Sequence, residues 1–171
     1  MKAEQKKQPK NPNRAGFRLS ASRLAAVQAL YEIEVTGSET DVVLKSFINK
    51  HWREVTLQDP DTKPGKGGKA RLTEPDQIYL TKLVEGVVAQ KGVIITDLDD
   101  VLTGEWKAER LDVLMRMLLC TASFELISEL DVPKRVLISE YTDLAYAFYE
   151  DNEAAFTAGI LSSLIAKLRP I

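Results

Sequence analysis

The sequence predicts an all-α protein of about seven helices, packed as two antiparallel sub-bundles. Apolar residues recur at spacings of three and four along most of the chain, which is the period of an amphipathic helix. Glycines, prolines and Asp or Asn residues mark the ends of these segments, and no segment predicts a convincing strand. Hydrophobic residues make up 44% of the 171 residues, enough for a core without disulfides or a metal.

Two helices are expected in the first third of the chain. Apolar spacing predicts one helix over residues 20–35, which Gly37 ends, and a second over residues 41–51. Residues 1–17 are rich in Lys, Gln, Asn and Pro and have no periodicity, so we expect a disordered basic tail. Residues 58–71 contain two prolines, three glycines and four cations, which favours a flexible insertion.

Three helices are expected to follow the insertion. Pro75 opens the first, which runs to about residue 90 and ends at Gly92. A short helix is expected over residues 93–102. Residues 108–128 are apolar on more than one face, so this helix should be central.

Two helices are expected to complete a single domain over residues 18–171. Asp131 should cap the first of them, with Pro133 in its first turn. Asp151 and the residue after it should cap the last helix. Gly159 inside that helix costs about 1 kcal/mol relative to alanine, which indicates a close approach of another backbone.

Charge is distributed unevenly along the chain. Residues 1–23 carry seven cations and one acid, a net charge of +6, whereas the whole chain carries −2. The remaining 148 residues therefore carry −8. This asymmetry predicts a polyanionic partner near the N-terminus and favours a basic protein partner for the acidic remainder. A tail that serves only solubility is the alternative.

The sequence contains no catalytic or metal-binding pattern, so we expect neither an enzyme nor a cofactor. His51 is the only histidine, and Cys120 is the only cysteine, placed in an apolar run that predicts a buried thiol. The three aspartates of residues 97–100 are better explained as a solvated face than as a cation site. The Gly-Lys pairs of residues 58–71 lack the Ser or Thr of a phosphate-binding loop.

A cytoplasmic location is expected. The first 20 residues have no apolar run of the kind found in secretory signals, and no stretch of 18 apolar residues could span a membrane. A single cysteine allows no disulfide within the chain, which is typical of a reducing compartment.

Three segments, in this order, resemble the NusB family of bacterial transcription antitermination factors. Residues 21–31, ASRLAAVQALY, resemble the family's Arg-x-x-Ala-x-Gln-Ala-Leu-Tyr run. FEL at residues 124–126 and DVPKRVLISEY at 131–141 resemble its Tyr-Glu-Leu and Val-Pro-x-x-Val-x-Ile-x-Glu. FTAGIL at residues 156–161 is similar to its Phe-Val-Asn-Gly-Val-Leu. The resemblance covers residues 18–168 and implies a NusB-like, all-helical fold.

The resemblance implies a binding and assembly role without catalysis. NusB pairs with NusE, which is also a protein of the small ribosomal subunit. The pair binds the boxA element of nascent RNA and helps RNA polymerase to ignore terminators, notably in ribosomal RNA operons. For this chain the implied partners are boxA-type single-stranded RNA, NusE and the transcription elongation complex, with a monomer or homodimer equally open. The alternative is a helical protein-interaction adaptor that does not bind RNA.

The candidate site combines cations for phosphates with a flat ring for bases. The expected RNA-binding residues are Arg14, Arg18, Arg23, Gln28, Asn152 and Phe156, and the expected partner-binding residues are Tyr31 and Arg116. Arg18 and Arg23 are five residues apart, so on a helix they would point about 140° apart and straddle an RNA strand. Core packing remains an alternative for Phe156 and Tyr31, and helix capping for Asn152.

The chain departs from the family's pattern at several cationic and polar positions. Residues 19–21 stand where adjacent arginines are frequent, and Cys120 stands where an arginine is common. Ala155 replaces a frequent lysine, and Ala158 replaces the asparagine before the glycine. We therefore expect low intrinsic affinity for RNA, with the tail lysines or the partner protein making up the difference.

Overall fold

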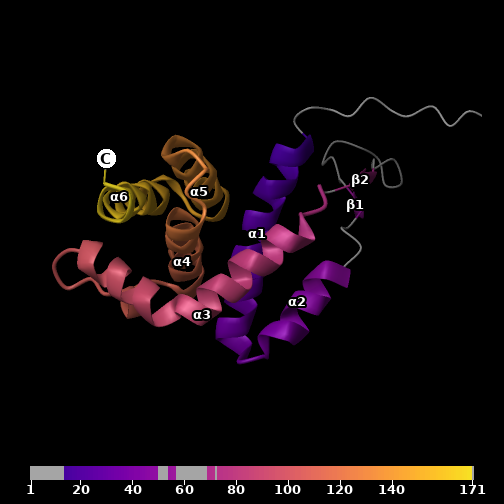
Figure 1. Ribbon diagram of the computed structural model, residues 1–171, viewed down its shortest axis with the longest axis horizontal. Helices are drawn as coiled ribbons and strands as arrows, with labels where there is room; N and C mark the ends of the chain where they lie inside the picture. The colour runs from indigo at the N-terminus through magenta and orange to yellow at the C-terminus, as the bar shows by residue number, and fades with distance from the viewer. Residues whose placement is uncertain (1–13, 50–53, 57–68, 72, 171) are drawn as a thin grey trace, which may run out of the picture.

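The computed structural model describes residues 14–49, 54–56, 69–71 and 73–170, and six α-helices dominate these residues (Figure 1). The all-α class is confirmed. The helices are α1 (Arg14–Thr36), α2 (Thr40–Asn49), α3 (Gln77–Val101), α4 (Val113–Ser128), α5 (Lys134–Phe148) and α6 (Asp151–Leu168). The 3₁₀ helix η1 (Ala108–Arg110) precedes α4.

The buried apolar side chains form two clusters that share α3 and α4. One cluster joins α1, α2 and the first part of α3 to one side of α4. The other joins α4, α5, α6 and the end of α3. Figure 1 shows this division, with α1 and α2 on one side of α4, α6 on the other, and α3 running past α4 from one side to the other. The central position expected for the most apolar helix is therefore confirmed for α4, whose middle is buried on all faces.

The predicted break at Gly92 is wrong, because α3 continues through this residue. Apolar side chains of α3 are buried both before and after Gly92. Their packing outweighs the loss of about 1 kcal/mol in helix stability that a glycine causes relative to alanine. The helix begins after Asp76, whose carboxylate accepts a hydrogen bond from the Tyr79 backbone N–H at 2.9 Å. Two predicted helices are therefore one.

Several predicted element ends also shift. Helix α1 begins at Arg14, six residues before the expected start and inside the segment expected to be a tail. Helix α4 begins only after Asp112, whose carboxylate accepts from the Met115 N–H. Pro133, rather than Asp131, is the residue that precedes α5.

A short antiparallel pair was also missed. Strand β1 (Glu54–Thr56) pairs with β2 (Lys69–Arg71), although no strand was expected. The predicted insertion at residues 58–71 therefore ends in a strand, while its residues 58–68 fall outside the described residues, as do residues 1–13 and His51.

The thiol predicted to be buried is buried, whereas the three aspartates of residues 97–100 have protein partners and do not form a free solvated face. Cys120 is buried, and burial raises the pKa of its thiol to about 12. Asp97 and Asp100 pair with Lys167 at 2.8 and 2.5 Å, and Asp99 accepts from the Ala108 N–H at 2.6 Å. No group of metal-binding side chains occurs among the described residues. None of the helices described here has the length and apolarity needed to cross a membrane.

The close backbone approach expected at Gly159 is wrong, because a methyl group there would meet no atom within 4 Å. The tight glycine is Gly86 on α3. A methyl group at Gly86 would overlap the ring of Phe124, which is buried on α4. Gly86 therefore lets α3 and α4 pack closely.

Gly86→Ala should lower the free energy of unfolding by about 1–2 kcal/mol, since overpacking against Phe124 exceeds the gain in helix propensity. Gly159→Ala is the matched control, because it makes the same change in an open helical position. It should raise stability by about 0.5–1 kcal/mol. Urea denaturation of the two variants measures both effects. Equal effects would contradict the close contact at Gly86.

Candidate nucleic-acid interface

Arg23, one of the expected RNA-binding cations, lies in the core with 2% of its surface exposed. Its Nε and Nη2 donate to the Glu125 carboxylate at 2.5–3.0 Å, and its Nη1 donates to Glu140 at 3.0 Å. The Arg23 guanidinium is therefore buried and fully engaged by two glutamates, so it cannot contact RNA. The predicted straddling of a strand by Arg18 and Arg23 fails for the same reason.

Glu125 is the centre of this ionic cluster and is fully buried. Its carboxylate also accepts hydrogen bonds from the hydroxyl of Tyr79 and, at 2.6 Å, from that of Tyr141. Burial and the neighbouring carboxylate raise the pKa of both phenols, so they remain donors. For Arg23, burial lowers the pKa, but the hydrogen bonds and charge of Glu125 outweigh it and raise the pKa overall. The cluster joins α1, α3, α4 and α5.

Arg18 remains a candidate for phosphate contact. Its side chain is partly exposed and has no ion-pair partner among the residues that the structure describes. Its backbone carbonyl accepts from the Asp76 N–H at 3.4 Å, which places this end of α1 beside the start of α3. Arg14 opens α1, but its side chain falls outside the described part of the chain.

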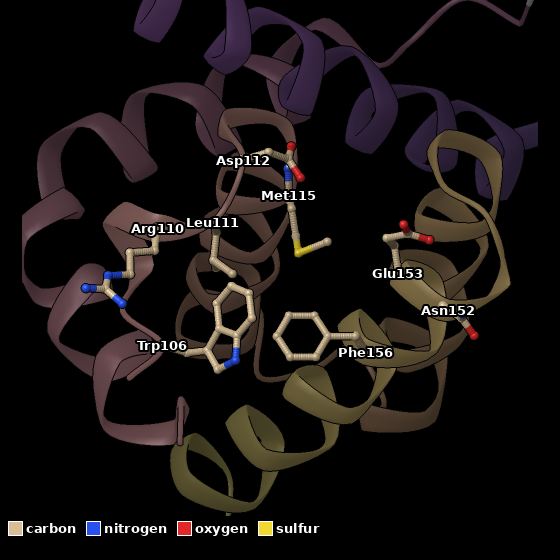
Figure 2. A pocket seen from close by; sticks show the side chains of 8 residues that line it. All are labelled: Trp106, Arg110, Leu111, Asp112, Met115, Asn152, Glu153 and Phe156. Atoms are coloured by element: carbon tan, nitrogen blue, oxygen red, sulfur yellow. The ribbon is translucent and has the colours of Figure 1, made fainter. Parts of the chain in front are cut away.

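The structure places Asn152 and Phe156 together at an open cavity of about 380 Å³, which we call the aromatic hollow (Figure 2). Its lining residues are Trp106, Arg110, Leu111, Asp112, Met115, Asn152, Glu153 and Phe156. Trp106 comes from the connection between α3 and α4, whereas Phe156 comes from the second turn of α6.

The two aromatic rings of the hollow form an exposed apolar surface. Their centroids are 5.6 Å apart with the ring planes tilted by 50°. Trp106 is 49% exposed and Phe156 is 37% exposed, so both keep ring surface in contact with water. The buried side chains of Leu111 and Met115 lie beneath them. Exposed flat rings of this kind can stack on unpaired bases.

Asn152 lies in the first turn of α6 and does not cap it, because Glu150 precedes the helix. The capping alternative for Asn152 is therefore excluded. Figure 2 shows the Asn152 side chain and the Arg110 guanidinium on opposite sides of the two rings, both extending away from them. Each can contact a strand whose base rests on the rings.

Gln28 and Tyr31 are exposed on one face of α1, three residues apart. Tyr31 lies near enough to Tyr149 to influence its pKa, which burial and the Asp112 carboxylate raise. The Tyr149 hydroxyl donates to Asp112 at 2.6 Å, and Asp112 lines the hollow. Tyr31 is therefore linked to the edge of the aromatic hollow through Tyr149 and Asp112.

Arg116 is held within the protein. Its guanidinium donates to the Glu34 carboxylate at 3.3 Å and to the Glu109 carbonyl at 3.4 Å. Lys91 also pairs with Glu34, so these contacts tie α1 to α3 and α4. Only 14% of the Arg116 side chain is exposed, which leaves little surface for a partner.

Six lining residues of the hollow were not predicted as site residues: the buried Leu111 and Met115, and Trp106, Arg110, Asp112 and Glu153. A tryptophan directly after Gly104-Glu105, between two helical segments, was the available signal. An aromatic side chain in an exposed connection is more often functional than one in an apolar stripe.

The comparisons with known proteins agree with this architecture. The family model described as the NusB family matches residues 20–166. A transcription antitermination protein NusB of Maricaulis maris is 34% identical over 165 residues, which cover 96% of this chain and 95% of that protein. The NusB of Caulobacter vibrioides is 34% identical over 150 residues, covering 88% and 93% of the two chains.

Solved structures show the same fold. NusB of T. maritima aligns with a TM-score of 0.64 at 22% identity, covering 91% of this chain and 92% of that one. A chain in a crystal structure of antitermination factors NusB and NusE in complex with dsRNA aligns with a TM-score of 0.66 at 19% identity, covering 89% and 98%. With a family match over residues 20–166 and relatives aligned over nearly their whole length, the chain belongs to the NusB family.

Proposed function

We propose that this protein is a non-catalytic transcription antitermination factor that binds boxA-type single-stranded RNA together with NusE, acts on the elongation complex and supports transcription of ribosomal RNA operons in the cytoplasm. The observation that carries the proposal is the aromatic hollow, where Phe156 and Trp106 expose flat rings beside Asn152 and Arg110. The family membership and the relative solved with NusE and dsRNA support it.

The cations of the proposed interface come from three places. Arg18 stands near the start of α1, beside the first residues of α3. Arg110 stands at the edge of the hollow, past the other end of this 25-residue helix, so an RNA strand that contacts both must run along α3 for about 37 Å. Arg14 and the four lysines of residues 1–10 would extend this positive surface, as expected for a basic tail. Gln28 is the remaining proposed RNA contact, and its side chain is exposed on α1.

NusE is proposed to bind the acidic remainder of the chain, which carries −8 outside residues 1–23. Tyr31 is the better of the two predicted contacts, because 41% of it is exposed. Arg116 would act mainly by holding α1 against α4. A complex of one copy each with NusE is compatible with either a free monomer or a free homodimer.

Binding of a fluorescent boxA oligonucleotide, measured by anisotropy with and without NusE, tests the RNA role. Three or four phosphate contacts predict that log K falls with log salt at a slope of roughly −2 to −3 for single-stranded RNA. A slope of log K against log salt near zero would mean that contacts between cations and phosphates do not contribute to RNA affinity. Absence of binding even with NusE present would rule out the RNA role.

A protein-interaction adaptor without RNA binding is the second candidate, and the burial of Arg23 favours it by removing one expected cation. The two functions differ in the effect of Arg18→Ala. The adaptor function predicts that this variant binds NusE and supports antitermination as the unmodified protein does. The RNA-binding function predicts weaker RNA binding with NusE binding unchanged.

A further inference from the structure

Two carboxylates make the aromatic hollow a poor place for a phosphate. Asp112 and Glu153 both line it, and each would repel a phosphate oxygen brought against the rings. Arg110 extends away from the rings (Figure 2). Its ion pair with Glu105 spans 3.8 Å between exposed side chains, so it competes only weakly with an RNA phosphate. The RNA backbone therefore belongs at the edge of the hollow and a base belongs inside.

The two carboxylates differ in their freedom to bind that base. Asp112 Oδ1 already accepts from the Met115 N–H and from the Tyr149 hydroxyl, which fixes this side chain at the start of α4. The Glu153 carboxylate has no hydrogen-bond or ion-pair partner in the part of the chain that the structure describes. It stands three residues before Phe156 on α6, so the two side chains share a helix face.

An ionised carboxylate can only accept hydrogen bonds, so it distinguishes bases by what they donate. Cytosine, adenine and guanine each present an exocyclic amino group, and in guanine a ring N–H lies beside it, whereas uracil presents a single N–H between two carbonyl oxygens. A carbonyl oxygen held against Glu153 would be repelled. We propose that the aromatic hollow is a base-selective subsite in which Phe156 and Trp106 hold one unstacked base and Glu153 selects a base that carries an amino group over uracil.

This inference rests on the proposed RNA-binding function and adds the class of base that the site takes. The test uses the full chain with NusE and two probes, oligocytidylate and oligouridylate of about twelve nucleotides each. Both probes carry the same number of phosphates and pyrimidine rings of similar size. At one fixed salt concentration, the unmodified protein should bind oligocytidylate about tenfold more tightly, as expected for one hydrogen bond to a charged acceptor.

Glu153→Gln should reduce this preference to within about twofold, because an amide can also donate to the uracil carbonyl. Glu150→Gln is the matched control. It removes the same charge one turn away, outside the hollow, at a residue whose side chain does not cap α6. This control should keep the tenfold preference even if general repulsion falls and both affinities rise.

The ratio of the two affinities decides the inference. The base selectivity alone would be overturned if the unmodified protein bound the two probes equally or preferred oligouridylate. It would also be overturned if the preference survived Glu153→Gln, or if the protein bound boxA RNA but neither homopolymer. Failure to bind boxA RNA as well, with NusE present, would overturn the proposed function and the subsite together.

Discussion

Arg23→Met should lower the free energy of unfolding by about 3–5 kcal/mol, because it leaves the buried Glu125 carboxylate without its cation. Methionine keeps the length of the side chain, so the change tests the charge more than the volume. Urea denaturation followed by circular dichroism measures the loss. Lys167→Met is the control, since Lys167 pairs with aspartates at the surface, and this substitution should lower the free energy of unfolding far less than Arg23→Met does.

A second substitution separates the buried charge from the other contacts of the cluster. Adding Glu125→Leu to Arg23→Met should recover part of the stability, because the uncompensated carboxylate is then gone. Recovery should be incomplete, since the hydroxyls of Tyr79 and Tyr141 lose their acceptor. A loss below about 1 kcal/mol for Arg23→Met alone would show that the cluster does not hold the two halves of the fold together.

The burial of Arg23 changes how an Arg23 variant is interpreted in an RNA-binding assay. Because Arg23 presents no surface, weaker RNA binding by such a variant should follow the fraction of unfolded protein. Arg18→Ala should instead weaken RNA binding without loss of stability, since its side chain is partly exposed and unpaired among the described residues. Comparing the two variants separates a phosphate contact from a core contact.

Local periodicity predicted the helices where one apolar face is continuous, as in α2 and α5. It failed at Gly92 because a glycine limits a helix only when packing does not compensate, and the packing of α3 comes from distant residues. The starts of α3 and α4 depend on hydrogen bonds from particular backbone N–H groups to the carboxylates of Asp76 and Asp112. The sequence alone does not show which N–H group each carboxylate binds.

The candidate site was predictable only where its residues are neighbours in the sequence. Asn152 and Phe156 lie one turn apart on α6, so one motif placed both. Burial of Arg23 could not be predicted from its own helix, because Glu125 and Glu140 are 102 and 117 residues away. A charged residue within the most apolar helix was nevertheless a signal, since a buried carboxylate requires a partner.

Phe156→Ala should weaken RNA binding by about ten- to hundredfold, the loss expected when a base loses one aromatic stacking partner. Its stability should change little, because the ring is 37% exposed and lines an open cavity. Anisotropy with boxA RNA in the presence of NusE measures the affinity. Tyr146→Ala is the matched control, since it removes an aromatic side chain that is 51% exposed on α5 and lies outside the hollow.

Trp106 makes this test specific to stacking. Its ring touches that of Phe156, so both contribute to one surface and their effects on RNA affinity should not add. The double variant should therefore lose less affinity than the product of the two single losses. If the two losses of affinity multiply fully, the rings contact different bases. If the Phe156→Ala variant binds RNA as tightly as the Tyr146→Ala variant, stacking in the hollow is contradicted.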